Sequence, residues 1–243
     1  MDLKERGTSQ NRHPWELSRA DMVLQLLARH ARSTRYADIG SGDLYFAQKL
    51  ADTADAPVYA VDVNYPESAT NGRVVICTDL NQVPSASIDC AVLMDVLEHV
   101  DDDVGLLRAV GRILTAAGEL VVTVPAHAFL WSDHDVFLGH RRRYNRDQVR
   151  DALQRGGFDI VECFYFYAGP FLARAAGVGL SRLGGEKKEA VGVGQWPYPS
   201  THVVTRTLRA MLNGDFRLSR LLGRTPVSGF GLSICALCRR TSA

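Results

Sequence analysis

The sequence predicts an α/β fold built on a mostly parallel sheet. Short apolar runs alternate with amphipathic helical segments over most of the first 166 residues, and this alternation is typical of βαβ units. Two of the runs end in an acid, Asp38 and Asp62, and the first passes directly into the turn Gly40-Ser41-Gly42. Such glycines let the backbone approach a ligand, while an acid after the second strand can accept hydrogen bonds from ribose hydroxyls. The sequence therefore also indicates a nucleoside pocket.

The elements follow in order from the hydrophobic pattern. A first helix is predicted at 14–32, where leucines and Met22 form an apolar side. Further helices are expected at 44–53, 101–115 and 145–155, the last stopped by Gly156-Gly157. Seven strands are expected, at 35–39, 57–63, 73–77, 88–94, 118–124, 158–166 and 231–238.

The glycine turn distinguishes between kinds of nucleotide. A dinucleotide fingerprint requires a third small residue for close helix packing around a pyrophosphate, and that position holds Leu44. The pocket therefore suits a nucleoside without phosphates, and S-adenosylmethionine is the obvious candidate. A nucleotide-binding protein such as a dehydrogenase is the alternative from another class, and Leu44 speaks against it.

Several motifs carry a family resemblance. The stretch Asp38-Ile39-Gly40-Ser41-Gly42-Asp43-Leu44 resembles the first motif of the class I S-adenosylmethionine-dependent methyltransferases, acid-x-Gly-x-Gly-x-Gly. Similarity continues through Cys77-Thr78-Asp79-Leu80, the strand 88–94 with Leu97-Glu98-His99-Val100, and the strand 118–124. His140-Arg141-Arg142-Arg143-Tyr144 is similar to the HxRRY pattern of one bacterial branch. The resemblance covers about 15–167 and the final strand. It implies a Rossmann-like, doubly wound, mostly parallel seven-stranded sheet with helices on both faces and a helical insertion before the last strand.

The resemblance also implies cofactor-binding residues. Asp38 would hold the methionine ammonium, and Asp95 would lie beside the methionine moiety. The other implied cofactor contacts are Gly40, Ser41 and Gly42 in the turn, Asp62 and Val63 at the ribose, and Asp79 and Leu80 at the adenine. Each acid also has a structural interpretation, as a turn former or a helix cap.

Catalysis depends on the acceptor. Methyl transfer from a sulfonium is a direct displacement to which the protein contributes mainly proximity and alignment. A hydroxyl acceptor would also benefit from a general base, for which His134 and His140 are the first candidates and His99 the next. The spacing of these histidines matches no compact ligand pattern, so no metal ion is expected. The arginines 141–143 are expected to form a salt-bridged face or to clamp an anionic acceptor.

The domain organisation follows from the long segment before the last strand. Residues 1–167 plus 229–243 are predicted to form the cofactor-binding domain, and 168–228 a helical insertion with basic amphipathic segments at 170–183 and 201–222. The insertion is expected to be either a mobile lid over the acceptor or a rigid helical layer. Between 170 and 230 there are nine Lys or Arg and three Asp or Glu, which raises a nucleic-acid methyltransferase as an alternative. The interleaved apolar residues favour instead a packed lid or a membrane-surface helix.

Composition bounds the remaining possibilities. The five cysteines are odd in number and lie mostly in apolar runs, so buried thiols in a reducing compartment are expected. The polar first thirteen residues do not resemble a signal peptide, and charges interrupt the longest apolar stretch. We therefore expect a cytoplasmic enzyme without a transmembrane segment, with peripheral membrane contact as an option. The expected acceptor is a small molecule or a lipid- or sugar-linked intermediate, methylated at a hydroxyl oxygen.

Overall fold

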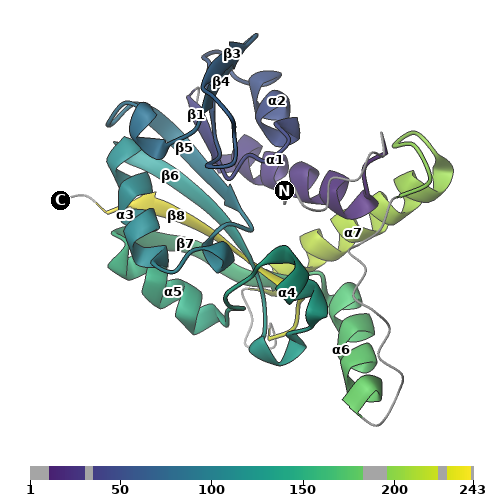
Figure 1. Ribbon diagram of the computed structural model, residues 1–243. Coiled ribbons are helices and arrows are strands. Elements are labelled where there is room, and N and C mark those ends of the chain that lie inside the picture. Colours follow the sequence, from purple (N-terminus) through teal and green to yellow (C-terminus); the bar gives the residue numbers. More distant parts are fainter. Residues whose placement is uncertain (1–10, 31–34, 183–195, 224–228, 242–243) are drawn as a thin grey trace.

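A computed structural model describes residues 11–30, 35–182, 196–223 and 229–241 of the chain. An eight-stranded sheet lies at its centre, in the order β3-β4-β2-β1-β5-β6-β8-β7 (Figure 1). Strands β4, β2, β1, β5 and β6 are parallel, while β8 runs antiparallel to both β6 and β7. The strands are β1 (Tyr36–Ile39), β2 (Val58–Val61), β3 (Ala69–Asn71), β4 (Val74–Cys77), β5 (Ile88–Met94), β6 (Leu114–Pro125), β7 (Phe158–Phe166) and β8 (Ser233–Arg240).

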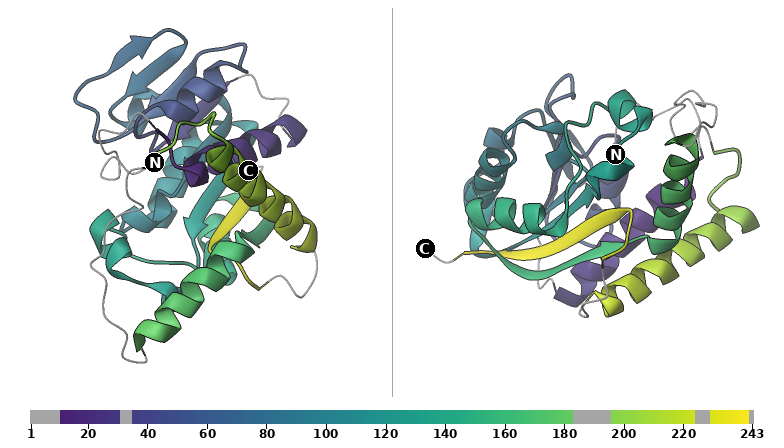
Figure 2. Two further views of the ribbon diagram at one scale, coloured as in Figure 1. Left: turned by 90° about the vertical axis from the view of Figure 1, so that its right-hand side faces the viewer. Right: turned by 90° about the horizontal axis from the view of Figure 1, so that it is seen from below.

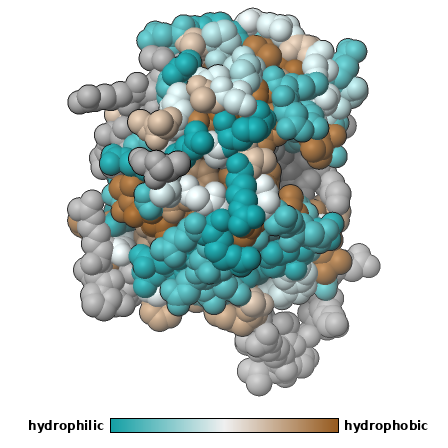
Figure 3. All heavy atoms as spheres, turned by 90° about the vertical axis from the view of Figure 1, so that its left-hand side faces the viewer, coloured by the Kyte–Doolittle hydropathy of each residue, from teal (hydrophilic) through white to brown (hydrophobic). Residues whose placement is uncertain are grey.

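Helices cover both faces of the sheet, as predicted. The longer ones are α1 (Pro14–His30), α2 (Tyr45–Ala51), α3 (Asp103–Ile113), α5 (Arg146–Arg155), α6 (Ala168–Arg182) and α7 (Val203–Leu222). The apolar sides of α1, α2 and α7 share one hydrophobic core with one face of the sheet, and those of α3 and α5 share a second core with the other face. The exposed positions of α5 are polar or charged, and the surface on this side of the molecule is largely hydrophilic (Figure 3).

The mostly parallel α/β fold is confirmed, and the structure adds elements that the sequence pattern missed. Strand β3 pairs antiparallel with β4 as a three-residue edge strand. All three of its residues are exposed, so it carries no apolar signal. The short helix α4 (Asp133–Leu138) lies in a stretch expected to be irregular. Three 3₁₀ turns, η2 (Leu80–Gln82), η3 (Leu97–His99) and η4 (Ala128–Leu130), complete the described elements.

The strand order sets the position of a ligand site. Strand β1 lies between β2 and β5, so the chain leaves β1 on one side and later continues on the other. In open α/β sheets, ligands bind in the crevice outside the carboxyl ends of the strands at such a switch point. Asp38 lies next to the last residue of β1 and Asp95 directly follows β5, so both lie at that crevice.

Helix α7 packs as part of the body of the protein. Figures 1 and 2 show it alongside α1, and Arg209 of α7 forms a two-pronged ion pair with Asp21 of α1. Phe216 is 2% exposed and packs against Phe164 and Phe166 of β7. These contacts favour the rigid layer over the mobile lid for α7. The sequence also predicts hinges for a lid at Gly184-Gly185 and at Gly192 and Gly194, and these glycines lie outside the described residues.

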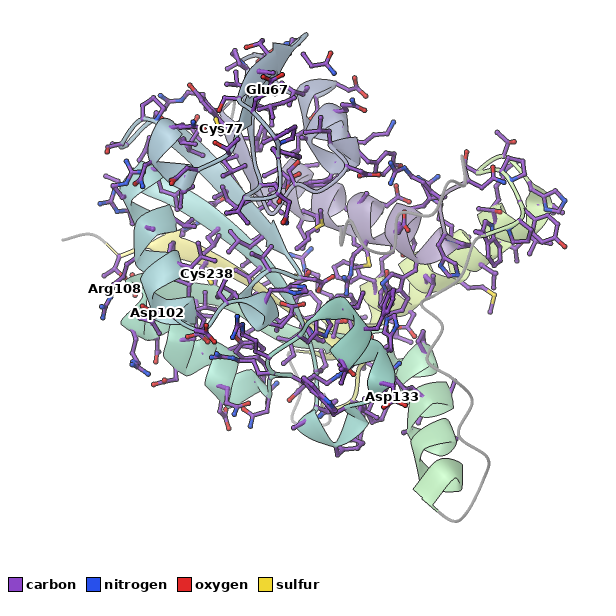
Figure 4. The ribbon with its side chains drawn as sticks, in the orientation of Figure 1. Glu67, Cys77, Asp102, Arg108, Asp133 and Cys238 are labelled. Atoms are coloured by element: carbon purple, nitrogen blue, oxygen red, sulfur yellow. The ribbon has the colours of Figure 1, made fainter. Side chains whose placement is uncertain are left out.

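All five cysteines are buried free thiols. Cys235 and Cys238 contribute to different hydrophobic cores on opposite faces of β8, as a strand predicts for residues three apart. Figure 4 shows Cys77 and Cys238 on their strands within the body of the protein. In the part of the chain that the structure describes, none of the helices combines the length and hydropathy needed to cross a membrane.

Candidate active site

A cavity of about 280 Å³ opens at the carboxyl ends of β1, β5 and β6. Its lining residues include Asp38, Gly40 and Ser41 of the glycine turn, and also Asp95, His99, His134 and His140. The wall also includes Arg12 and His13, which precede α1, and Trp15, Glu16, Arg19 and Ala20 of α1. The cavity therefore joins the predicted cofactor residues to the predicted catalytic ones.

The glycine turn has the backbone geometry that its sequence suggests. Gly40 and Gly42 have φ angles of +73° and +55°, values that favour glycine. The N–H groups of Gly40 and Ser41 both donate to the carbonyl oxygen of Val61, at 2.7 and 3.1 Å. A Cβ on Gly40 would lie 2.5 Å from Cγ2 of Val96, so the glycine is needed for close approach to the turn after β5.

Leu44, which stands where the resembled motif has its third glycine, has a left-handed backbone. Its φ is +66°, and it is the N-cap of α2. A left-handed backbone is costly for a branched side chain but tolerated where surrounding structure enforces it. Leu44 thus holds a backbone conformation that a glycine would adopt at lower cost.

Asp62 organises the glycine turn. One carboxylate oxygen accepts a hydrogen bond from the N–H of Gly42 at 3.0 Å, and the other accepts two from Asn64 at 2.9 and 3.0 Å. Asp62 does not line the cavity, nor do Gly42, Val63, Asp79 or Leu80.

Two of the predicted cofactor contacts, Val63 at the ribose and Asp79 at the adenine, are exposed at the surface. Val63 is 83% exposed. Asp79 is exposed, and its carboxylate accepts from the N–H of Asn81 at 2.7 Å in a capping box with Gln82. The structure therefore gives Asp79 a capping role, the structural alternative that its sequence position allowed.

Asp38 is a buried acid in the cavity wall. It is 2% exposed, and its Oδ2 has no hydrogen-bond partner among the described residues. Burial raises the pKa of this carboxyl to about 6. Burial removes the hydration that stabilises an ionised carboxylate, and a cationic ligand group beside Asp38 would compensate for that loss.

Asp95, which also lines the cavity, lies in a strained turn directly after β5. Its φ is +55°, which is uncommon outside glycine and typical of functional turns. The carboxylate forms an ion pair with Arg19 of α1 and accepts a hydrogen bond from Oγ1 of Thr123 at 3.3 Å. This ion pair connects α1 to the end of β5 at the cavity wall.

The three predicted catalytic histidines, His99, His134 and His140, all line the same cavity. The rings of His99 and His140 meet edge to face with centroids 4.8 Å apart. Nδ1 of His140 lies 2.9 Å from Oδ1 of Asp135, which orients the ring and leaves Nε2 as the remaining nitrogen. Burial opposes ionisation of Asp135, but hydrogen bonds from His140 and Arg143 hold its pKa well below the usual value.

The arginine run is largely engaged in structural contacts. Arg141 forms an ion pair with Asp101, and Arg142 forms one with Asp103 at 3.3 Å. Arg143 is buried and donates to Asp135 at 2.7 Å and to the carbonyl oxygen of Ala126 at 3.0 Å. The salt-bridged alternative thus describes the run, and Arg143 alone of these three lines the cavity.

Glu98 is a cavity residue to which the sequence pattern assigned no role. Its side chain is fully buried, and neither carboxylate oxygen has a hydrogen-bond partner among the described residues. Burial raises its pKa to about 8. The signal in the sequence was a charged residue within the compact turn between β5 and α3, but a single sequence does not reveal that the turn is buried.

Comparisons with known proteins agree with this geometry. A family model described as "Methyltransferase domain" matches residues 11–163. A probable S-adenosylmethionine-dependent methyltransferase of Mycobacterium tuberculosis is 29% identical over 191 residues, covering 74% of this chain and 69% of the relative.

Two solved structures show the same fold at low identity. A putative sarcosine dimethylglycine methyltransferase from Galdieria sulphuraria aligns with a TM-score of 0.57 and 11% identity, covering 96% of this chain and 92% of that one. The [4+2]-cyclase SpnF aligns with a TM-score of 0.58 and 15% identity, covering 97% and 86%. Since the family model covers well over half of the sequence, the chain belongs to the S-adenosylmethionine-dependent methyltransferases.

Proposed function

We propose that the enzyme methylates a hydroxyl oxygen of a small-molecule or lipid- or sugar-linked acceptor. The observation that carries the proposal is that the same cavity is lined by a buried acid, Asp38, and by His99, His134 and His140. The acid suits the ammonium of the methionine moiety, and the imidazoles suit a group that loses a proton during transfer.

In this proposal the cofactor extends from the cavity toward the carboxyl ends of β2 and β4. The backbone of Gly40, Ser41 and Gly42 would lie against its centre, and Asp95 near the methionine. Asp62 and Val63 would approach the ribose, and Asp79 and Leu80 the adenine. Asp62 already accepts bonds from Gly42 and Asn64, so its ribose contacts would use its remaining lone pairs.

The transfer itself is an in-line displacement. A lone pair of the acceptor oxygen forms the new O–C bond, and the electron pair of the breaking C–S bond moves to sulfur, giving S-adenosylhomocysteine. The hydroxyl proton passes to a histidine, for which His134, His140 and His99 are the candidates. His140 is held by Asp135 in a fixed orientation, an arrangement typical of a base positioned by a carboxylate.

An apolar portion of the acceptor is supported by the surface beside the cavity. Exposed apolar residues gather on η4, α4, the start of α6 and the approach to β8; these are Phe129, Trp131, Val136, Phe137, Leu172 and Phe230. Ring contacts join Phe171 to both Phe129 and Phe230. Helix α4 also supplies His134 and Leu138 to the cavity wall, so these apolar residues lie on elements that border the site.

Three of the nine basic residues between 170 and 230 form ion pairs within the protein, which weakens the nucleic-acid alternative. Arg209 pairs with Asp21, Arg220 with Glu162, and Arg174 with Asp135. Arginines that are neutralised within the protein do not form a track for phosphates. The cyclase with the same fold also shows that the site, and not the fold, must decide the reaction.

Two measurements test the proposal. Thermal shift should show stabilisation by S-adenosylhomocysteine and none by NAD. The enzyme is then incubated with methyl-¹³C S-adenosylmethionine and fractionated small-molecule and lipid extracts, and the labelled product is identified by NMR. An O-methyl product supports the proposal, and an N-, C- or S-methyl product would overturn the hydroxyl assignment while leaving the enzyme class intact.

A further inference from the structure

Glu98, His99 and His140 converge on one point in the cavity wall. One ligand atom from each lies within 4.8 Å of the others. Glu98 and His99 come from the turn η3, and His140 comes from the segment after α4, about 40 residues later. This separation explains why no compact metal pattern is visible in the sequence.

The Glu98 carboxylate is fully buried without hydrogen bonds among the described residues, and a bound cation would stabilise its negative charge. A buried carboxylate without hydrogen bonds is costly, and buried charges in proteins are paired or coordinate metals. The two arginines that act on Glu98, Arg19 and Arg143, are already paired with Asp95 and Asp135. Neither donates a hydrogen bond to the Glu98 carboxylate.

His140 has the arrangement expected of a ligand. Ligating histidines donate their other ring N–H to a carboxylate or carbonyl, which fixes the ring and raises its basicity. Asp135 serves His140 in this way through Nδ1 at 2.9 Å. Asp135 is itself fully buried and is held by Arg143 and by the N–H of Ser132, so the support extends one layer further.

We propose that Glu98, His99 and His140 bind a divalent transition-metal ion. Two imidazoles and one carboxylate form a donor set suited to zinc, manganese or iron(II), with positions left open for other ligands. With bonds of about 2.0–2.1 Å, tetrahedral ligand atoms lie roughly 3.3 Å apart. Side-chain rotations that shorten these separations by at most about 1.5 Å would complete the site.

The ion would bind the acceptor oxygen, a role that rests on the proposed hydroxyl acceptor. A bound cation lowers the pKa of a coordinated hydroxyl, so the acceptor would reach the methyl group as an alkoxide-like nucleophile. With His99 and His140 engaged as ligands, His134 remains as the candidate base for the released proton.

The test measures metal binding directly. Protein without a polyhistidine tag is stripped with chelator and titrated with Co²⁺ while the visible absorption is followed, and with Zn²⁺ and Mn²⁺ by calorimetry. We expect one ion per chain. Glu98→Gln, His99→Ala and His140→Ala should each lower affinity by at least the roughly 10–100-fold typical of lost supporting residues, and Asp135→Asn by about that amount. His134→Ala, from the same cavity but outside the cluster, is the control and should bind the ion as the wild type does.

Circular dichroism and S-adenosylhomocysteine binding of every variant separate metal loss from unfolding. Absence of one-to-one binding by the folded wild type would overturn the metal site, as would equal affinity in wild type, Glu98→Gln and His140→Ala. Cofactor binding and O-methylation by metal-free protein would remove the ion from the reaction and leave the proposed function standing. Metal binding together with an N-methyl product would support the metal site and overturn the proposed hydroxyl acceptor.

Discussion

The backbone N–H of Arg141 donates to the carbonyl oxygen of Glu98 at 2.7 Å. Two further bonds follow the same path, from Nε of Arg141 to the carbonyl oxygen of His99 at 2.9 Å and from Tyr144 Oη to that of Leu97 at 3.2 Å. The HxRRY segment (140–144) therefore holds the turn after β5 through hydrogen bonds to three consecutive carbonyl oxygens, and we call this arrangement the clamp. Because His140 directly precedes Arg141, the clamp also fixes the contact between His140 and His99.

Removing the Tyr144 hydroxyl tests this clamp. The hydroxyl also lies 2.9 Å from Oδ2 of Asp103, and it is buried, so Tyr144→Phe should destabilise the fold by about 1–3 kcal/mol. Urea unfolding followed by circular dichroism measures the loss. An unchanged midpoint and slope would mean that Arg141 alone holds the turn.

Gly40 tests the packing between the first motif and the same turn. Gly40→Ala places a Cβ 2.5 Å from Val96 Cγ2 at a φ of +73°, and overpacking of this kind costs about 1–3 kcal/mol. Val96→Ala opens the space, so the double variant should recover part of the loss, with a coupling of about 0.5–3 kcal/mol. Gly72→Ala is the matched control, because Gly72 has a φ of +59° and a Cβ added to it would meet nothing within 4 Å. If the two glycine variants lose equal stability and Val96→Ala rescues neither, backbone strain alone is responsible.

Asp38 tests the cofactor assignment. Asp38→Asn keeps the shape of the side chain and removes its charge, and hydrogen bonds to charged groups contribute about 1.5–3 kcal/mol. Calorimetry with S-adenosylhomocysteine should therefore show affinity weaker by about 10- to 150-fold. Asp89→Asn is the control, because Asp89 lies near the start of β5, outside the cavity lining, and pairs with Arg35. This variant should bind S-adenosylhomocysteine with wild-type affinity. Equal affinity in folded Asp38→Asn and wild type would exclude Asp38 from the site.

The pH dependence of cofactor binding follows from the same residue. Burial raises the pKa of Asp38 from 3.8 to about 6. Between about pH 4 and 6, the Asp38 carboxyl is therefore protonated in the folded apoprotein but ionised in the unfolded chain. This group therefore lowers the stability of the apoprotein as pH rises through that window. Stabilisation by S-adenosylhomocysteine should grow over the same range, because the ammonium pairs with the ionised carboxylate. Thermal shifts at about pH 5 and about pH 7.5, on either side of the raised pKa, measure the difference, and Asp38→Asn should show much less of it. An identical pH profile in that variant would assign the effect to another group.

The fold was largely predictable because its signals are local. Apolar runs and amphipathic segments located most strands and helices, and the glycine turn identified the edge of the sheet where ligands bind. Strand β3 was missed because all its residues are exposed, and α4 because six polar and apolar residues carry no clear period. The predicted histidines do share a cavity, but Glu98 received no role, since its burial results from contacts with a segment about 40 residues away.

The most direct test of the account is a crystal structure of the enzyme with S-adenosylhomocysteine. We predict the amino group of the ligand within hydrogen-bond distance of Asp38, directly or through one water. The backbone of Gly40 and Ser41 should lie along the ligand, the ribose near Asp62, and the sulfur should face His99 and His140. A ligand bound away from Asp38 and the glycine turn, or with its sulfur turned away from the histidines, would contradict the account.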